Sequence, residues 1–149
     1  MDSIVCLHEP ETWLWMRRRV DGSNGDERRT IVKRVGCFDF VQGLAEIADV
    51  CVVDKDKEVA FYDELFGTSH FFFLRTMKRD DLLILRDMEG YRRFVCLSND
   101  PSSAVHEDVA QIFGRNGKSI AAPIINPYNV NTGYLFNLSK VIKDVVKRR

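Results

Sequence analysis

The chain has 149 residues, enough for one compact domain, and its 45% hydrophobic content with ten Phe and two Trp can fill a core. Its 22 Lys and Arg residues balance 22 Asp and Glu residues, so there is no strong signal for nucleic-acid binding. No apolar run is long enough to cross a bilayer and no signal-peptide pattern is present, so neither a membrane span nor secretion is expected.

A short apolar strand is expected at residues 3–7, and it runs into a polar, proline-containing turn at residues 8–12. Residues 13–20 and 29–35 then flank a segment with Asn24-Gly25 at its centre, which predicts an antiparallel hairpin. The hairpin has basic residues that are candidates for binding an acidic or phosphorylated partner: Arg17, Arg19, Arg29 and Lys33. The alternative interpretation is a solvated hairpin face balanced by acidic neighbours.

Helices and strands alternate through the middle of the chain. After Gly36, apolar residues at helical spacing predict a helix that feeds a strand at 49–53, followed by a helix at 57–66 and a strand at 70–74. That first helical stripe comprises Phe38, Val41, Leu44, Ala45 and Ala48. Trp13 and Trp15 are two residues apart and are expected to pack in the core beneath the hairpin, with a partner-facing role as the alternative.

The last third repeats the alternation. Residues 82–88 are ambiguous, 94–97 form a strand, and Ser102 or Ser103 is expected to cap a helix that ends at Phe113. A short strand at 120–124 and a turn at 126–129 precede a carboxy-terminal helix. Its expected apolar stripe comprises Leu135, Leu138, Val141, Ile142 and Val145.

Short apolar strands alternating with helices predict an α/β fold, with a parallel sheet covered on both faces. Ligands of such sheets bind beyond the carboxyl ends of the strands. Three polar segments follow strands there, at residues 8–12, 54–56 and 98–100, and we expect them to converge.

Three of the four cysteines, Cys6, Cys51 and Cys96, lie within apolar runs and are expected to be buried thiols, as is Cys37. No set of Cys and His residues has the spacing of a metal site, so no metal ligand is predicted. Free thiols indicate a reducing compartment, cytoplasm or nucleus.

The segments 5–13 (VCLHEPETW), 32–41 (VKRVGCFDFV) and 94–103 (FVCLSNDPSS) resemble motifs of the FCP/SCP group, phosphatases that act on the RNA polymerase II tail. Glu11 and Thr12 agree with the family motif that follows the first strand. The resemblance implies a three-layer, Rossmann-like domain of the haloacid dehalogenase (HAD) type over residues 1–149, with a β-hairpin insertion after the first strand. Related translocase receptor subunits bind peptides and hydrolyse no phosphate.

Four functional positions of that family are changed here. His8 stands in the position of the nucleophilic Asp, Pro10 in that of the general acid, and Ser98 in that of the late metal-binding Asp. Asp54 stands in the position of a phosphate-binding Thr or Ser, and Lys78 is the best candidate for the family's lysine. Mg²⁺ prefers charged oxygen ligands and Pro10 has no proton to give, so the resemblance implies a degenerate site.

We therefore expect a catalytically inactive, phosphatase-like protein that binds a protein or peptide partner, such as a phosphatase or a phosphoprotein, without a cofactor. Asn99, which the family shares, and Asp100 are further binding candidates. A first alternative is a divergent Mg²⁺-dependent phosphatase that uses Asp54, Asp56 or Asp100 as substitute ligands. A second is a translocase-receptor-like peptide-binding subunit in a mitochondrial-type organelle.

Overall fold

The computed structural model describes residues 1–21, 27–67, 70–100, 103–122 and 133–147, without the side chains of the hairpin from residue 18 to residue 30. Its strands are β1 (Ser3–His8), β2 (Trp15–Asp21), β3 (Glu27–Lys33), β4 (Asp49–Val53), β5 (Phe72–Leu74), β6 (Arg93–Ser98) and β7 (Gly117–Ala121). Its helices are α1 (Cys37–Ala45), α2 (Val59–Phe66), α3 (Arg79–Asp87), α4 (Ala104–Phe113) and α5 (Tyr134–Lys147), with a 3₁₀ turn at Gly114–Asn116.

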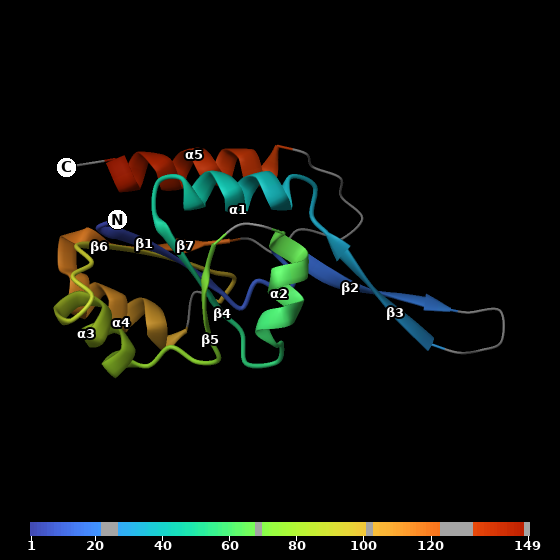
Figure 1. Ribbon diagram of the computed structural model, residues 1–149, viewed down its shortest axis with the longest axis horizontal. Coiled ribbons are helices and arrows are strands. Elements are labelled where there is room, and N and C mark those ends of the chain that lie inside the picture. Colours follow the sequence, from blue (N-terminus) through green and yellow to red (C-terminus); the bar gives the residue numbers. More distant parts are fainter. Residues whose placement is uncertain (22–26, 68–69, 101–102, 123–132, 148–149) are drawn as a thin grey trace.

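Five parallel strands form the central sheet in the order β5-β4-β1-β6-β7 (Figure 1). β1 lies in the middle, and its residue Cys6 is in register with Cys51 of β4 and Cys96 of β6. The chain winds from β1 outward through β4 and β5, then crosses back to β6 and β7. The loops after β1 and β6 therefore diverge, and this switch point is where open α/β sheets place their ligands.

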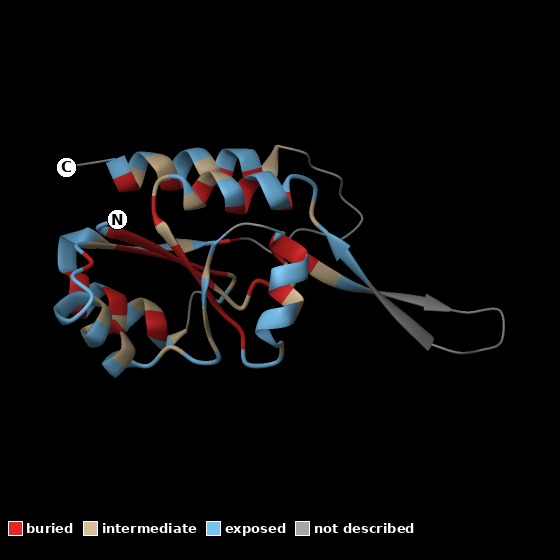
Figure 2. Ribbon diagram, in the orientation of Figure 1, coloured by how far each residue is buried: buried red, intermediate tan, exposed pale blue. Residues whose placement is uncertain are grey.

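Helices cover both faces of the sheet, which confirms the predicted three-layer α/β architecture. On one face, helices α1, α2 and α5 pack over a core that includes Val5 of β1 and Val52 of β4 (Figure 2). On the opposite face, α3 and α4 pack over a second core around Ile4 and Phe94. The strands read as continuous apolar runs because both of their faces are buried.

The predicted hairpin is present after β1. β2 and β3 pair antiparallel, with Trp15 opposite Lys33 and Arg19 opposite Arg29. Figure 1 shows this pair reaching away from the parallel sheet. Trp13 and Trp15 are both fully buried, as expected, although Trp13 precedes β2 instead of lying within it.

Two helical stripes differ from the sequence prediction. Phe38 of α1 is 41% exposed, and the buried positions are Cys37, Phe40, Val41 and Leu44. In α5, Val141 is 49% exposed and Val146 is buried instead. Each helix is rotated relative to our prediction because apolar residues occur on more than one of its sides, and contact with the neighbouring helix and sheet decides which side is buried.

Other boundaries are mixed. The segment at 82–88, which the sequence left ambiguous, lies in α3 as far as Asp87. The helix predicted to follow Ser102 or Ser103 and to end at Phe113 is confirmed as α4, although Ser103 makes no side-chain capping bond. The last strand runs from Gly117 to Ala121, earlier than the predicted 120–124, because it is an edge strand with mostly exposed side chains and a weak apolar signal. Residues 123–132, with the predicted turn at 126–129, lie outside the described residues.

All four cysteines are buried free thiols, as predicted. Burial raises the pKa of Cys37 to about 12, so this thiol stays protonated and unreactive at neutral pH. Within the described part of the chain, no helix has the length and apolarity needed to span a bilayer.

Candidate functional site

The three polar segments that follow β1, β4 and β6 meet at one end of the sheet. They surround a cavity of about 300 Å³ lined by Glu9, Glu11, Thr12, Asp54, Lys55, Asp56 and Asn99. The amide of Asn99 donates a hydrogen bond of 2.8 Å to the hydroxyl of Thr12, which joins the first and third segments directly. We call this cavity the strand-tip site.

The turn after β1 has a constrained backbone. Glu9 has φ of 45° and Thr12 has φ of 81°, values that L residues with side chains rarely adopt. Arg34, just beyond β3, holds the turn by donating to the carbonyl oxygens of Trp13 at 2.7 Å and Thr12 at 3.0 Å. Pro10 is buried, and its carbonyl oxygen accepts the N–H of Leu14 at 2.9 Å. Pro10 therefore acts through its backbone and has no proton to transfer.

Asp54 is buried at the end of β4 with both carboxylate oxygens engaged. The Tyr62 hydroxyl of α2 donates to Oδ2 at 2.5 Å, and the N–H of Asp56 donates to Oδ1 at 2.9 Å. Trp15 Nε1 donates in turn to the Tyr62 oxygen at 3.2 Å. Burial, with the bond to Asp54, raises the pKa of Tyr62 far above its ordinary value, so the hydroxyl remains a donor. This chain of bonds connects the hairpin, α2 and β4.

His8 lies at the end of β1, half-buried, and does not line the cavity. Its Nδ1 is buried and has no hydrogen-bond partner among the described residues, and the same holds for Nδ1 of His106 on α4. Burial lowers the pKa of His8, the charges of His106 and Lys55 act in the same direction, and Glu9 and Asp100 oppose them. His8 is thus held towards the neutral form at pH 7.

Ser98 at the end of β6 is buried and serves the turn that follows it. Its hydroxyl accepts the N–H of Asp100 at 3.1 Å, and the carbonyl of Asp100 lies 3.0 Å from Nε2 of His106. This side chain, for which the FCP/SCP resemblance predicts the position of a metal-binding Asp, is therefore occupied in stabilising its own loop.

The other candidate residues are not among those that line the cavity. Lys78 is exposed at the start of α3, where its N–H donates to the Asp81 carboxylate at 2.8 Å, and it does not line the strand-tip site. Arg17 lies at the base of the hairpin and pairs with Glu11 of the cavity wall at 3.3 Å. Lys33 is exposed. Arg19 and Arg29 are paired in register, and their side chains lie outside the described part of the hairpin.

The donors present do not fit Mg²⁺. Among the described residues, no group of three or more His, Cys, Asp and Glu side chains converges in a way that could hold a metal ion. Asp54 is committed to Tyr62 and Asp56, and Glu11 is paired with Arg17. Mg²⁺ needs carboxylate oxygens that are free to complete an octahedron.

Phosphate is also a poor fit. Among the described residues, the cavity is lined by four carboxylates, Glu9, Glu11, Asp54 and Asp56, and by one cation, Lys55. An anion placed among them would be repelled, most strongly where water is excluded. Cationic groups of a partner suit this lining better than a phosphoryl group.

Sequence reasoning missed two members of the site. Lys55 lines the cavity, and its position directly between Asp54 and Asp56 was a signal that could have found it. Tyr62 had no such signal, because it lies eight residues further on in α2 and only the packing of that helix on the sheet brings its hydroxyl to Asp54.

No family model matches the chain, and no curated protein matches it. Solved structures do match. A candidate HAD superfamily (subfamily III A) hydrolase from Legionella pneumophila has a TM-score of 0.52 and 12% identity, over 98% of this chain and 84% of that one. A hypothetical protein from Xanthomonas campestris has a TM-score of 0.52 and 13% identity, over 96% and 82%. With the strand order above, these similarities show a HAD-like, Rossmann-like α/β fold.

Proposed function

We propose that this HAD-like domain is catalytically inactive and works by binding a protein partner. The observation that carries the proposal is that residues at the altered positions form hydrogen bonds within the protein, so these groups are not free to act on a substrate. Asp54 is bonded to Tyr62, Ser98 to its own loop, and Pro10 holds Leu14 through its carbonyl. A phosphatase of the FCP/SCP group, which the sequence resembles, needs free carboxylates at the positions of His8, Pro10 and Ser98.

A partner with positive charge suits the strand-tip site, because four carboxylates surround it with one lysine. The basic hairpin candidates Arg17, Arg19, Arg29 and Lys33 remain proposed contacts for an acidic segment of a partner, such as a phosphatase or a phosphoprotein. A cytoplasmic or nuclear location is part of the same proposal, and the four free buried thiols support it.

The test is hydrolysis of a generic aryl phosphate by the purified protein, at several pH values, with Mg²⁺, with other divalent metals and with chelator. We expect no metal-dependent turnover above that of a His8→Ala variant. The control is a His8→Asp/Pro10→Asp/Ser98→Asp variant, which returns the family's carboxylates and shows whether the fold can support them.

Robust turnover that chelator abolishes would overturn the proposal. Loss of that turnover in Asp56→Asn or Asp100→Asn, with folding retained, would then establish the divergent-phosphatase alternative. No observation in the structure favours the translocase-receptor alternative over a general protein-binding role.

A further inference from the structure

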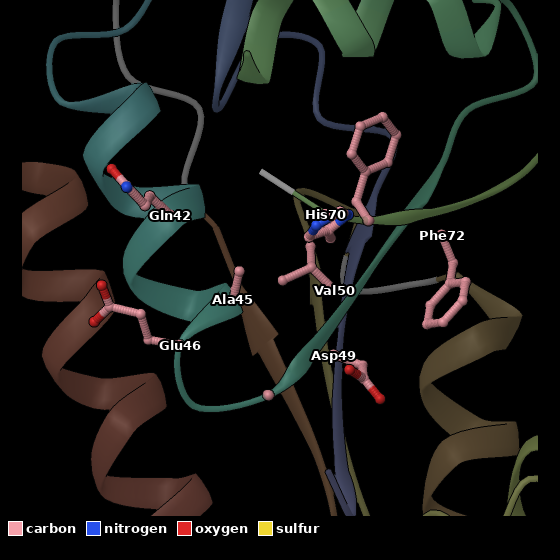
Figure 3. Close-up of a pocket in the computed structure, with 9 residues that line it drawn as sticks. Gln42, Ala45, Glu46, Asp49, Val50, His70 and Phe72 are labelled. Atoms are coloured by element: carbon pink, nitrogen blue, oxygen red, sulfur yellow. The ribbon is translucent and has the colours of Figure 1, made fainter. Parts of the chain in front are cut away.

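Two cavities lie on either side of the edge strand β5, and neither shares a lining residue with the strand-tip site. The first, of about 450 Å³, lies between α1 and the segment that leads into β5, and Gln42, Glu46, Asp49 and His70 give it polar walls (Figure 3). The second, of about 240 Å³, lies on the α3 side and has mainly apolar walls that include Leu74, Ile84 and Tyr91. We call them the α1 pocket and the α3 pocket.

Phe72 lines both pockets, and its side chain is 56% exposed although it belongs to the sheet. Ile84, in the wall of the α3 pocket, is 46% exposed. Large apolar side chains that are exposed around a concave surface are typical of binding surfaces. The two pockets therefore share one exposed aromatic side chain at the rim of the sheet.

The main chain of β5 is open along this rim as far as the described strands go, because β5 is the last of them on its side of the sheet. The carbonyl of Leu74 accepts the N–H of Asp54 following β4, so the main-chain groups of Leu74 and Phe72 face inward. Alternation along the strand then directs the N–H and C=O of Phe73 outward. An edge with unpaired groups is a template for another strand.

Side chains alternate between the two faces of any strand added to this edge. One set of alternate residues would enter the α1 pocket, and the next set would enter the α3 pocket. The residues that line each pocket indicate which kind of side chain would bind there. Glu46 in the α1 pocket favours a cation, whereas the apolar walls of the α3 pocket favour an aliphatic side chain.

Charge complementarity extends over both sides. Asp81 and Glu89 are the charged residues of the α3 pocket, and among the described residues that line the two pockets there is no lysine or arginine. A second copy of β5 would present Phe71 and Phe73 to the α1 pocket instead of a cation. A basic segment of another protein therefore fits better than self-association.

We propose that the edge of β5 binds an extended peptide segment of a partner protein, in which Lys or Arg residues alternate with aliphatic residues. The segment pairs with the open edge of β5, inserts a cationic side chain into the α1 pocket beside Glu46 and places its apolar neighbour beside Phe72 and Ile84. Affinity comes from the main-chain bonds and selectivity from the two pockets. This surface extends the protein-binding role proposed above, but it does not depend on the chemistry of the strand-tip site.

The probe is the labelled, end-capped peptide Val-Lys-Val-Lys-Val-Lys-Val, titrated with the full chain by fluorescence polarisation. We expect saturable binding that is lost when Glu replaces Lys. Two further versions carry N-methyl groups on one or the other alternate set of amides. One of the two should lose binding, because only one set of N–H groups faces β5. Equal binding by both versions would overturn strand pairing.

Protein variants test the pockets. Glu46→Gln removes one exposed carboxylate and should weaken binding by about two- to five-fold, the range of an exposed ion pair. Phe72→Ser should weaken it by roughly ten-fold or more, as expected for a central aromatic contact. Glu64→Gln and Phe136→Ser are matched controls, since both side chains are exposed on other surfaces and should leave binding unchanged.

Peptide affinity that is unaltered in both Glu46→Gln and Phe72→Ser would overturn the proposal. So would a homodimer of the protein that Phe72→Ser dissociates, because a second copy would then occupy the edge of β5. Increased hydrogen-exchange protection of the Phe73 amide on peptide binding would support it. Hydrolysis of an aryl phosphate reports on the strand-tip site alone, so failure of the proposed function and failure of this inference are distinguishable.

Discussion

At the scale of single residues, buried polar groups account for most of the architecture of the strand-tip site. Asp54 is 5% exposed, and a carboxylate removed from water needs donors to offset the loss of hydration. Tyr62 supplies one donor and the N–H of Asp56 supplies another. The same tyrosine oxygen accepts the indole N–H of Trp15, so a single hydroxyl satisfies two buried groups.

Removing that hydroxyl with Tyr62→Phe should lower the free energy of unfolding by about 1–3 kcal/mol, because Asp54 and Trp15 each lose a partner. Tyr91→Phe is the comparison, since its hydroxyl donates to Asp49 at 2.6 Å and Asp49 is only half-buried. Water can replace that bond, so its cost should stay below about 1 kcal/mol. Urea unfolding of both variants measures the difference. Equal costs would contradict the role given to Asp54.

At the scale of elements, close contact between α4 and β7 fixes where the last strand lies. A Cβ atom on Gly117 would lie 2.8 Å from the carbonyl oxygen of Val109 and 2.9 Å from Cβ of Phe113. The strand can approach the helix only because residue 117 has no side chain. This contact also explains why β7 begins earlier than its apolar residues indicated.

Gly117→Ala should therefore destabilise the fold by about 1–3 kcal/mol through overpacking against the backbone of α4. Gly43 in α1 is the matched control, because its added Cβ would meet nothing closer than Nζ of Lys143 at 3.9 Å. Gly43→Ala should stabilise the protein by about 0.5–1 kcal/mol, the difference in helix propensity. Thermal unfolding of both variants tests the pair. The same sign of change in both would contradict the packing argument.

At the scale of the whole molecule, the carboxyl ends of the strands and the open edge at β5 offer two different surfaces. The carboxyl ends carry the strand-tip site, whose polar groups are bonded to one another. The open edge at β5 carries two pockets and an exposed aromatic side chain. A fold that hosts chemistry at one end in other proteins can bind partners at either place, since function belongs to sites and not to folds.

Overall stability should respond to pH through His8. Burial lowers its pKa below the ordinary value of about 6.5. The unfolded chain consequently binds more protons as the pH falls through 6.5, and the contribution of neutral His8 to folding is lost there. The free energy of unfolding should drop between pH 7 and pH 5, and should drop less in His8→Gln. Denaturant titrations at both pH values measure this. An equal drop in the free energy of unfolding in the parent protein and in His8→Gln would show that His8 does not contribute to the pH dependence.

The sequence by itself determined the alternation of helices and strands, the hairpin and the meeting of three polar segments, because periodicity and apolar runs report local structure and burial. It also contains His8, Pro10 and Ser98, and only the FCP/SCP resemblance makes these positions ones where carboxylates are expected. The similarity of solved structures supports the HAD-like fold and leaves the FCP/SCP resemblance as a prediction.

Only the tertiary structure decided which atoms touch. The sequence did not identify Tyr62 as the partner of Asp54, because helix α2 has to pack on the sheet before the two meet. It placed Lys78 at the site, whereas Lys55 lines the cavity. It misjudged Phe38 and Val141, because several sides of a helix can carry apolar residues and the neighbouring elements select the one that is buried. Local pattern determines what an element is, and long-range packing determines what it contacts.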